Sequence, residues 1–169
     1  MTAAPETGLL EALRGTAPDL LAYFERRVQP REDAADLLSE VMLQAWRRLD
    51  AAPSDLERRR MWLFTIARNV LANRARTNRR RSALTERIRQ QLADTDAIPD
   101  HLAVAVRDVV LRLPEAQREL VMLIHWDGFS IREAAELLGL NPSTARSRYA
   151  AAREALQRSL EPAAAERTI

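Results

Sequence analysis

The chain has 169 residues and is 47% hydrophobic and 30% charged, a composition that indicates a folded globular protein of one domain or two small ones. It contains no cysteine, which excludes a disulfide framework, thiolate metal ligands and a thiol redox sensor within this chain; because its two histidines lie far apart in sequence, we also expect no metal site. No apolar run approaches the roughly 18 residues of a membrane span and the N-terminus lacks a signal-peptide pattern, so we expect a soluble, cytoplasmic protein.

Residue usage and charge distribution narrow the class further. Four glycines and few β-branched residues leave little material for a sheet, whereas Ala, Leu, Arg and Glu dominate and favour helix, so we predict an all-α protein. The net charge is only +2, yet residues 57–81 carry nine arginines against one acid, while residues 1–56 carry six arginines against ten acids. This asymmetry predicts nucleic acid as one partner and a different partner for the acidic N-terminal third.

Two helices are expected in the N-terminal third. Residues 19–26 begin a helix with one apolar face, and Pro30 interrupts the chain after it. Residues 31–50 then place apolar side chains three and four positions apart, which is the spacing of an amphipathic helix. The members of this stripe are Ala34, Leu37, Leu38, Val41, Ala45 and Leu49.

The basic block is expected to form the next helix. Residues 51–55 predict a turn, and Ser54 with Glu57 fits a capping box. The following segment, RRRMWLFTIARNVLANRARTNRRR, interleaves aromatic side chains with arginines, and such a helix can hold a nucleic-acid backbone while rings stack on unpaired bases. The alternative is that Trp62 and Phe64 are core residues, the commoner role for aromatics. Nine arginines against one acid favour phosphate contacts over a merely solvated face.

The C-terminal part predicts a helix-turn-helix in SIREAAELLGLNPSTARSRY, residues 130–149. Ser130 caps the first helix with Glu133 as its reciprocal partner, and Gly139 ends that helix. Asn141 caps the second helix, with Pro142 in its first turn. Upstream of this motif, Pro114 is predicted to be the first residue of another helix. The Asp-Gly pair at residues 127–128 predicts a turn after that helix.

The second helix of this motif is expected to enter the major groove of DNA. The side chains that would meet base edges and phosphates are Ser143, Thr144, Arg146, Ser147, Arg148 and Arg153. The side chains that would face the core are Ala145, Tyr149, Ala152 and Leu156. The alternative is a plain helical hairpin with solvated arginines. For His125 we expect a partly buried, hydrogen-bonded histidine and no ligand role.

Three blocks in order resemble the extracytoplasmic-function group of sigma-70-type bacterial sigma factors. EDAADLLSEVMLQAWRRLD is similar to the helix that docks on the polymerase clamp, and MWLFTIARNVLANRARTNRRR is similar to the segment that binds the promoter −10 element. LPEAQRELVMLIHWDGFSIREAAELLGLNPSTARSRYAAAREAL is similar to the domain that reads the −35 element, and it is the most specific of the three.

This resemblance implies roles for individual residues. Asp33, Asp36 and Glu40 would lie on the polymerase-docking helix. Asn69 falls where the family places a residue near the flipped, unpaired −10 base, and Trp62 belongs to the same segment. The phosphates around that base would be held by Arg68, Arg74 and Arg76. Arg146 and Arg148 would act on the −35 duplex.

The resemblance also implies the organisation and partners of the chain. Two small helical domains, a region 2-like bundle at 1–76 and a region 4-like helix-turn-helix domain at 101–160, would be joined by a flexible linker at 77–100 and followed by a tail at 161–169. Core RNA polymerase, promoter DNA (duplex at −35, melted at −10) and an anti-sigma factor, often membrane-anchored, would be the partners. The chemistry is binding, so we expect no enzyme activity, catalytic residue, cofactor or small-molecule substrate.

Two other classes remain open from the residues alone. A stand-alone helix-turn-helix regulator would bind duplex DNA without polymerase and would usually be a dimer, but it gives no role to the acidic helix or the basic-aromatic block. A nuclease would use the basic block to hold its substrate, but the carboxylates do not cluster at metal-binding spacing.

Overall fold

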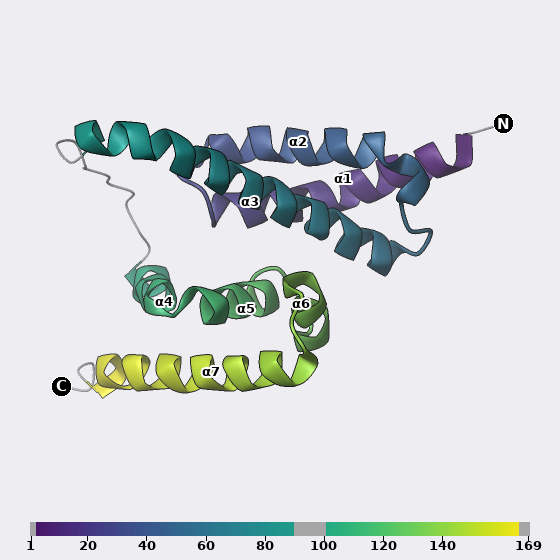
Figure 1. The fold of residues 1–169 in the computed structure, drawn as a ribbon. Coiled ribbons are helices and arrows are strands. Elements are labelled where there is room, and N and C mark those ends of the chain that lie inside the picture. The colour runs from purple at the N-terminus through teal and green to yellow at the C-terminus, as the bar shows by residue number, and fades with distance from the viewer. Residues whose placement is uncertain (1–2, 90–100, 166–169) are drawn as a thin grey trace. The chain divides into compact units, whose positions relative to one another are not determined.

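The computed structural model describes residues 3–89 and 101–165, in which the chain forms seven α-helices, one short 3-10 helix and no strand (Figure 1). The all-α prediction is therefore confirmed. The chain divides into two compact units, Met1–Ala93 and Asp94–Ile169, and each is described by itself. No helix within the described residues combines the length and apolar character needed to cross a membrane.

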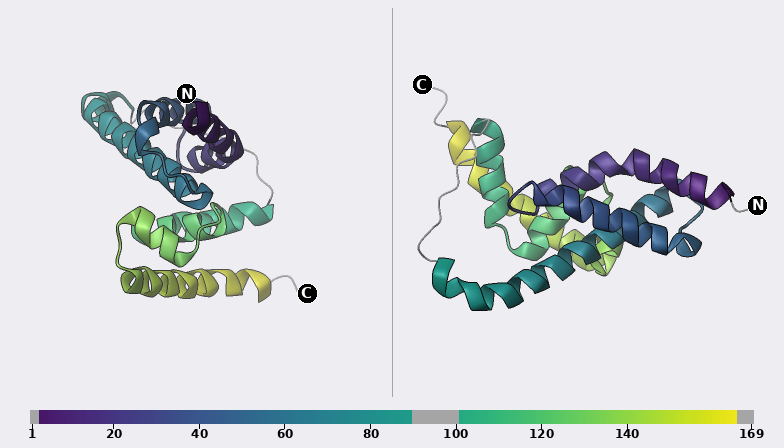
Figure 2. Two further views of the ribbon diagram at one scale, coloured as in Figure 1. Left: turned by 90° about the vertical axis from the view of Figure 1, so that its right-hand side faces the viewer. Right: turned by 90° about the horizontal axis from the view of Figure 1, so that it is seen from above.

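The first unit is a three-helix bundle in which each helix packs on the other two (Figures 1 and 2). Its elements are α1 (Ala3–Glu25), α2 (Asp33–Arg47), the 3-10 helix η1 (Leu49–Ala51) and α3 (Leu56–Arg89). Helix α1 begins well before the predicted start at residue 19 and contains Pro18. Its earlier turns are held because they also contribute to the core, where Ala12 and Leu13 are buried.

The core of the first unit is formed by the apolar stripes of its helices. Four members of the predicted stripe, Ala34, Leu37, Val41 and Ala45, are buried on α2, and Leu38 is half-buried. The last member, Leu49, is half-buried and lies in η1, because α2 ends at Arg47 and not at residue 50. Aromatic rings join α1 to α3: the Tyr23 ring meets those of Phe24 and Phe64 edge-on, at centroid distances of 5.3 and 5.5 Å. The α3 side of the core consists of Leu63, Phe64, Ile66, Ala67 and Val70.

The start of α3 differs from the predicted capping box. Asp55 precedes the first helical residue, and its Oδ1 accepts a 2.9 Å hydrogen bond from the backbone N–H of Arg58, so Asp55 and not Ser54 is the N-cap. Arg59 further ties this corner to α1. Its Nε donates to the carbonyl of Pro53 at 2.7 Å, its Nη1 to that of Gly8 at 2.8 Å and its Nη2 to that of Ser54 at 3.3 Å.

Helix α3 is longer than expected. It continues to Arg89, so residues 77–89 of the predicted linker are helical, and residues 90–100 lie outside the described part of the chain. The reason is local: residues 79–89 contain no glycine or proline and are rich in Arg, Ala, Leu and Glu, which have high helix propensity.

The second unit contains α4 (His101–Arg112), α5 (Glu115–His125), α6 (Ile131–Leu138) and α7 (Pro142–Ala165). Pro114 lies one residue before α5 as its N-cap and is not its first helical residue. Helix α7 packs on the other three helices and continues to Ala165, into the segment predicted as a tail. The cluster at its centre consists of Val110, Leu113, Val121, Met122 and Ala152, with Tyr149 and Leu156 packed against it.

The helix-turn-helix of α6 and α7 is formed with the predicted caps. Ser130 and Glu133 make both bonds of a capping box, and Gly139 ends α6 in the left-handed region at φ 63°. The Oδ1 of Asn141 accepts hydrogen bonds from the backbone N–H and the hydroxyl of Ser143, at 2.9 and 2.8 Å. The three residues between α6 and α7 are therefore held from both sides.

Candidate functional site

The first turns of α7 present a polar stripe to solvent. Ser143, Arg146 and Ser147 are exposed, and because Arg146 and Ser147 lie three and four residues after Ser143, the three share one face of the helix. Arg153 is exposed seven residues after Arg146 and extends this face, whereas Thr144 is half-buried. The opposite side of the helix is apolar, with Ala145 and Ala152 fully buried as predicted.

Arg148 does not lie with Arg146. The two are two residues apart, which places them on nearly opposite sides of a helix with 3.6 residues per turn. Arg148 is also half-buried, whereas Arg146 is exposed. The structure thus brings Ser143, Arg146 and Ser147 together on one side of α7 and places Arg148 on another.

His125, the last residue of α5, contacts α7. Its Nε2 and the Tyr149 hydroxyl are 2.8 Å apart, and the two rings stack with centroids 5.9 Å apart and an interplanar angle of 27°. The predicted hydrogen-bond partner is confirmed, but His125 is exposed, so the expectation of a partly buried side chain is wrong. It is exposed because it is the last residue of α5, and its contact with Tyr149 on α7 leaves the rest of the ring open to solvent.

Helix α3 presents a second stripe, in the first unit. Trp62, Asn69 and Arg76 are spaced by seven residues each, so they lie along one face of the helix. Asn69 and Arg76 are exposed there, beside the exposed Arg68, and Trp62 is half-buried. Phe64, by contrast, is 1% exposed and belongs to the core, so of the two aromatics in this block only Trp62 has a ring within reach of solvent.

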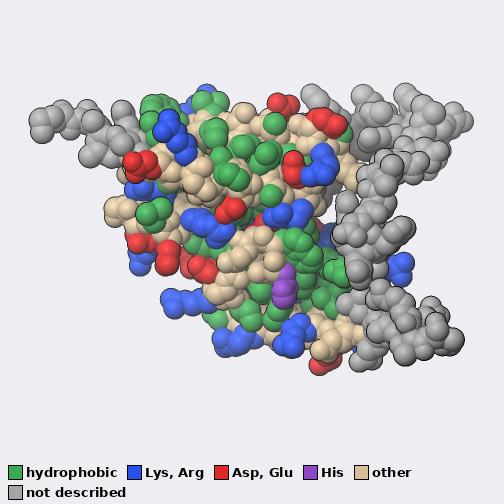
Figure 3. Space-filling model, turned by 180° about the vertical axis from the view of Figure 1, so that it is seen from behind, with side chains coloured by type: hydrophobic (Ala, Val, Ile, Leu, Met, Phe, Trp, Pro, Cys, Tyr) green, Lys and Arg blue, Asp and Glu red, His purple; other side chains and the backbone are tan. Residues whose placement is uncertain are grey.

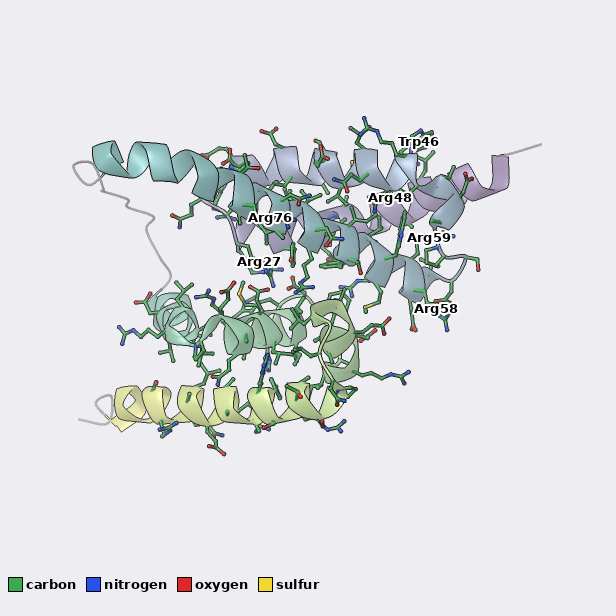
Figure 4. All side chains as sticks on the ribbon, in the orientation of Figure 1. Arg27, Trp46, Arg48, Arg58, Arg59 and Arg76 are labelled. Atoms are coloured by element: carbon green, nitrogen blue, oxygen red, sulfur yellow. The ribbon has the colours of Figure 1, made fainter. Side chains whose placement is uncertain are left out.

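Two arginines of the predicted −10 segment bond within the unit. The Nη2 of Arg76 donates to the Oδ1 of Asn73, one turn earlier on the same helix, and Arg76 stands apart along α3 from the arginines of its first turns (Figure 4). The Nη2 of Arg74 donates to the Oδ2 of Asp33 on α2, forming an ion pair in which both side chains are less than one third exposed. Arg74 and Asp33, predicted for different partners, thus contact each other.

The outer face of α2 carries acidic side chains in its first half and large apolar side chains in its second half. Asp36 and Glu40 are exposed, and the Oε1 of Glu40 accepts a 2.8 Å hydrogen bond from Gln44 Nε2. Further along the same face, Leu43 is 44% and Trp46 47% exposed; Figure 4 places Trp46 near the end of α2. The face of the first unit shown in Figure 3 likewise has acidic, basic and hydrophobic side chains interspersed.

Leu43 and Trp46 were missed by sequence reasoning, which assigned only carboxylates to this face. The signal was present, because Leu43 lies seven residues after Asp36 and three before Trp46, off the buried stripe. A large exposed aromatic beside an exposed leucine marks an interaction surface more strongly than single charges do. Among the described residues no group of three or more His, Asp or Glu side chains is placed to hold a metal ion.

Two family models match the chain, one in each unit. The family described as "Sigma-70 region 2" matches residues 13–81, and the family described as "Sigma-70, region 4" matches residues 103–156. The chain is 28% identical over 165 residues to the ECF RNA polymerase sigma factor SigL of Mycobacterium tuberculosis, with 94% of this chain and 93% of the relative covered. It is 37% identical over 134 residues to the probable RNA polymerase sigma-C factor of Mycobacterium bovis, with 76% and 71% covered.

Two solved structures are similar over most of the chain. The sigma factor RpoE of Bartonella quintana, in complex with the anti-sigma factor NepR, has a TM-score of 0.66 at 28% identity and covers 92% of this chain and 96% of its own. CnrH, in complex with the cytosolic domain of CnrY, has a TM-score of 0.59 at 26% identity, with 92% and 87% covered.

Proposed function

Because this chain belongs to the extracytoplasmic-function group of sigma-70 sigma factors, and is an alternative sigma factor that directs transcription initiation, we propose that its two units divide the recognition of a promoter between them. Residues 1–76 dock on core RNA polymerase and bind the melted −10 element. Residues 101–160 read the duplex −35 element. Residues 77–100, which begin with the last turns of α3, join these domains, and residues 161–169, into which α7 continues as far as Ala165, form a C-terminal extension. The observation that carries this division is that each unit presents its own exposed, DNA-suited stripe.

In the second unit, α7 enters the major groove with its exposed stripe toward the bases. Arg146 suits bidentate contact with a guanine edge, and Ser143 and Ser147 suit bases or phosphates at the same approach. Arg153 follows on the same face and meets the phosphate backbone. Arg148 and Thr144 are both half-buried and lie four residues apart on another side of α7, from which they contact the phosphate backbone and not the bases.

In the first unit, the stripe of α3 captures single-stranded DNA. Asn69 offers an amide donor and acceptor to the edge of an unpaired base, and the exposed part of the Trp62 ring offers a stacking surface about two helical turns away. Arg68 and Arg76 are exposed beside them and bind the flanking phosphates. Holding an unstacked base favours the opened promoter, because the closed duplex does not offer it.

The outer face of α2 docks on core RNA polymerase. Asp36 and Glu40 pair with basic groups of the polymerase, which steers the encounter. Leu43 and Trp46 continue this face and are buried on docking, where a tryptophan supplies more free energy than exposed charge pairs do.

A regulator of this kind works when it is released, so we propose an anti-sigma factor as a further partner. The support is that two similar proteins were each solved with a partner protein. RpoE was solved with the anti-sigma factor NepR, and CnrH with the cytosolic domain of CnrY. The chain then acts in the bacterial cytoplasm. While bound to an anti-sigma factor that is anchored in the membrane, the chain is held at the membrane. Its work is binding, without catalysis of its own.

Run-off transcription with core RNA polymerase and genomic DNA fragments tests the proposal. The purified chain should bind core polymerase and direct transcripts from fragments on which core alone does not initiate. A chain that neither binds core nor directs any transcript would refute it. A dimer that binds palindromic duplex sites without polymerase would favour a stand-alone regulator instead.

A further inference from the structure

One ion pair joins the two functional helices of the first unit. Arg74 of α3 and Asp33 of α2 are 41 residues apart in sequence, yet their side chains are hydrogen-bonded, with 29% and 27% of the side-chain surface exposed. Each was predicted to contact a different macromolecule: Asp33 the polymerase and Arg74 the phosphates of the −10 element. Both contacts would require this pair to separate.

The position of Arg74 on α3 favours the internal contact. Arg74 follows the buried Leu63, Ala67 and Val70 at four-, three- and four-residue steps, so it continues the core-facing side of the helix. The exposed stripe that carries Asn69 lies on another side. Because one Nη of its guanidinium is committed to a carboxylate, Arg74 adds little net positive charge to that stripe.

Asp33 likewise lies at the edge of the docking face. It is the first residue of α2, one position before the buried Ala34 and four before the buried Leu37. Asp36, three residues later, is exposed, whereas Asp33 is not. The carboxylate therefore points along the α2–α3 contact rather than outward with Asp36.

The pair lies where α3 leaves the core. Val70 is the last buried residue among the α3 side chains described, which extend to Asn78, and α3 itself continues to Arg89. Beyond Val70 the packing that holds α3 against α2 thins, and Arg74 supplies a charged hydrogen bond at that point. Without such a contact, the turns of α3 beyond Val70 would be free to bend or shift relative to the rest of the bundle.

We propose that Asp33 and Arg74 are positioning residues: they tie the basic half of α3 to the docking helix and set where Arg76 and Asn69 meet the −10 strand, without themselves contacting polymerase or DNA. This proposal rests on the proposed function. It adds that the −10 stripe is aligned to the polymerase through one ion pair inside the sigma factor. It also replaces the docking role of Asp33 and the phosphate role of Arg74.

A charge exchange tests this with opposite outcomes. Asp33→Asn and Arg74→Gln are compared with the exchanged pair Asp33→Arg/Arg74→Asp, each as holoenzyme with core polymerase. If the pair is an internal tie, each single change slows open-complex formation about fivefold, a usual size for loss of one member of a contacting pair. The exchanged pair recovers at least half of the wild-type rate, limited by an arginine at the N-terminus of α2. If the residues contact polymerase and DNA, the exchanged pair is worse than either single variant.

Matched controls separate the tie from direct contacts. Asp36→Asn should weaken core binding, while Asp33→Asn leaves the Kd for core within about twofold. Arg76→Gln should lower the salt-dependence slope of holoenzyme binding to a −10 single strand by about 0.7, the amount for one phosphate contact, while Arg74→Gln leaves the slope unchanged. A Kd change in Asp33→Asn equal to that of Asp36→Asn, or a slope change in Arg74→Gln, would overturn the proposal.

Stability is measured on the same variants. Open-complex rates are taken well below each variant's Tm, so that only folded protein is compared. A lowered Tm with unchanged open-complex rates would reduce the pair to a structural role and overturn the positioning proposal. Wild-type protein that fails to initiate transcription would instead refute the proposed function, so the two failures are distinguishable.

Discussion

Arg59 offers a quantitative test of how the first unit is held together. Its guanidinium donates to three backbone carbonyls from two places, Gly8 on α1 and the turn residues Pro53 and Ser54. Arg59→Ala removes all three hydrogen bonds and leaves the carbonyls to water. Arg58→Ala is the matched control, because Arg58 is the preceding residue of the same helix turn and is exposed (Figure 4).

The magnitude follows from the number and burial of these bonds. A hydrogen bond from a charged group contributes about 1.5–3 kcal/mol when water is excluded. Arg59 is half-buried and its third bond, at 3.3 Å, is long, so water recovers part of the loss. We expect a loss of about 2 kcal/mol in the free energy of unfolding of the first unit, or about 30-fold in its unfolding equilibrium. Arg58→Ala should stay within about 0.5 kcal/mol of wild type.

Urea unfolding followed by tryptophan fluorescence measures this. Trp46 and Trp62 lie in the first unit and Trp126 in the second, so the series is built on Trp126→Phe and the signal then reports the first unit alone. Arg59→Lys provides a further check, because one ammonium cannot reproduce a fork of donors to three carbonyls. Equal unfolding midpoints for Arg59→Ala and Arg58→Ala would refute the reasoning.

Three further expectations concern the interfaces and the turn. Trp46→Ala should weaken binding to core polymerase by about 10- to 100-fold, as loss of a buried aromatic anchor does, with unchanged helix content by circular dichroism; unchanged core affinity would remove Trp46 from the docking face. Arg146→Ala should cost about 1–3 kcal/mol in affinity for a −35 duplex while core binding persists, and equal loss of both would contradict the division between units. Gly139→Ala should lower the stability of the second unit by about 1 kcal/mol, because alanine is disfavoured at φ 63°; a thermal melt with an unchanged Tm would show that the turn relaxes.

Features decided by neighbours in sequence were predictable. The capping box of Ser130 and Glu133 and the cap at Asn141 involve residues two and three positions apart, so residue type and spacing suffice to place them. The buried stripe of α2 follows from helical periodicity in the same way. These signals predict the helix-turn-helix and the amphipathic helix α2 without any knowledge of tertiary contacts.

Features decided by distant partners were not. Ser54 and Asp55 are equally good capping residues, so residue type does not choose between them. The cap is Asp55, and the first turn of α3 is also held by the hydrogen bond from Arg59 to the carbonyl of Gly8 on α1, 51 residues away in sequence. Periodicity likewise places Arg74 on a helix face but does not say that Asp33 lies opposite it. Trp46 was left unassigned although it lies off the buried stripe of α2, because helical spacing does not give the exposed fraction of its ring, which is 47% in the packed bundle.

The doubly capped turn between α6 and α7 has a consequence for the entropy of promoter binding. Ordering one residue's backbone costs about 1–2 kcal/mol, and Gly139 and Asn141 hold this turn before any DNA is present. The reading helix is thus preorganised and docks as a rigid body, so little of its contact free energy is spent on folding. Discrimination among −35 sequences then rests on base edges and on the shape of the duplex itself.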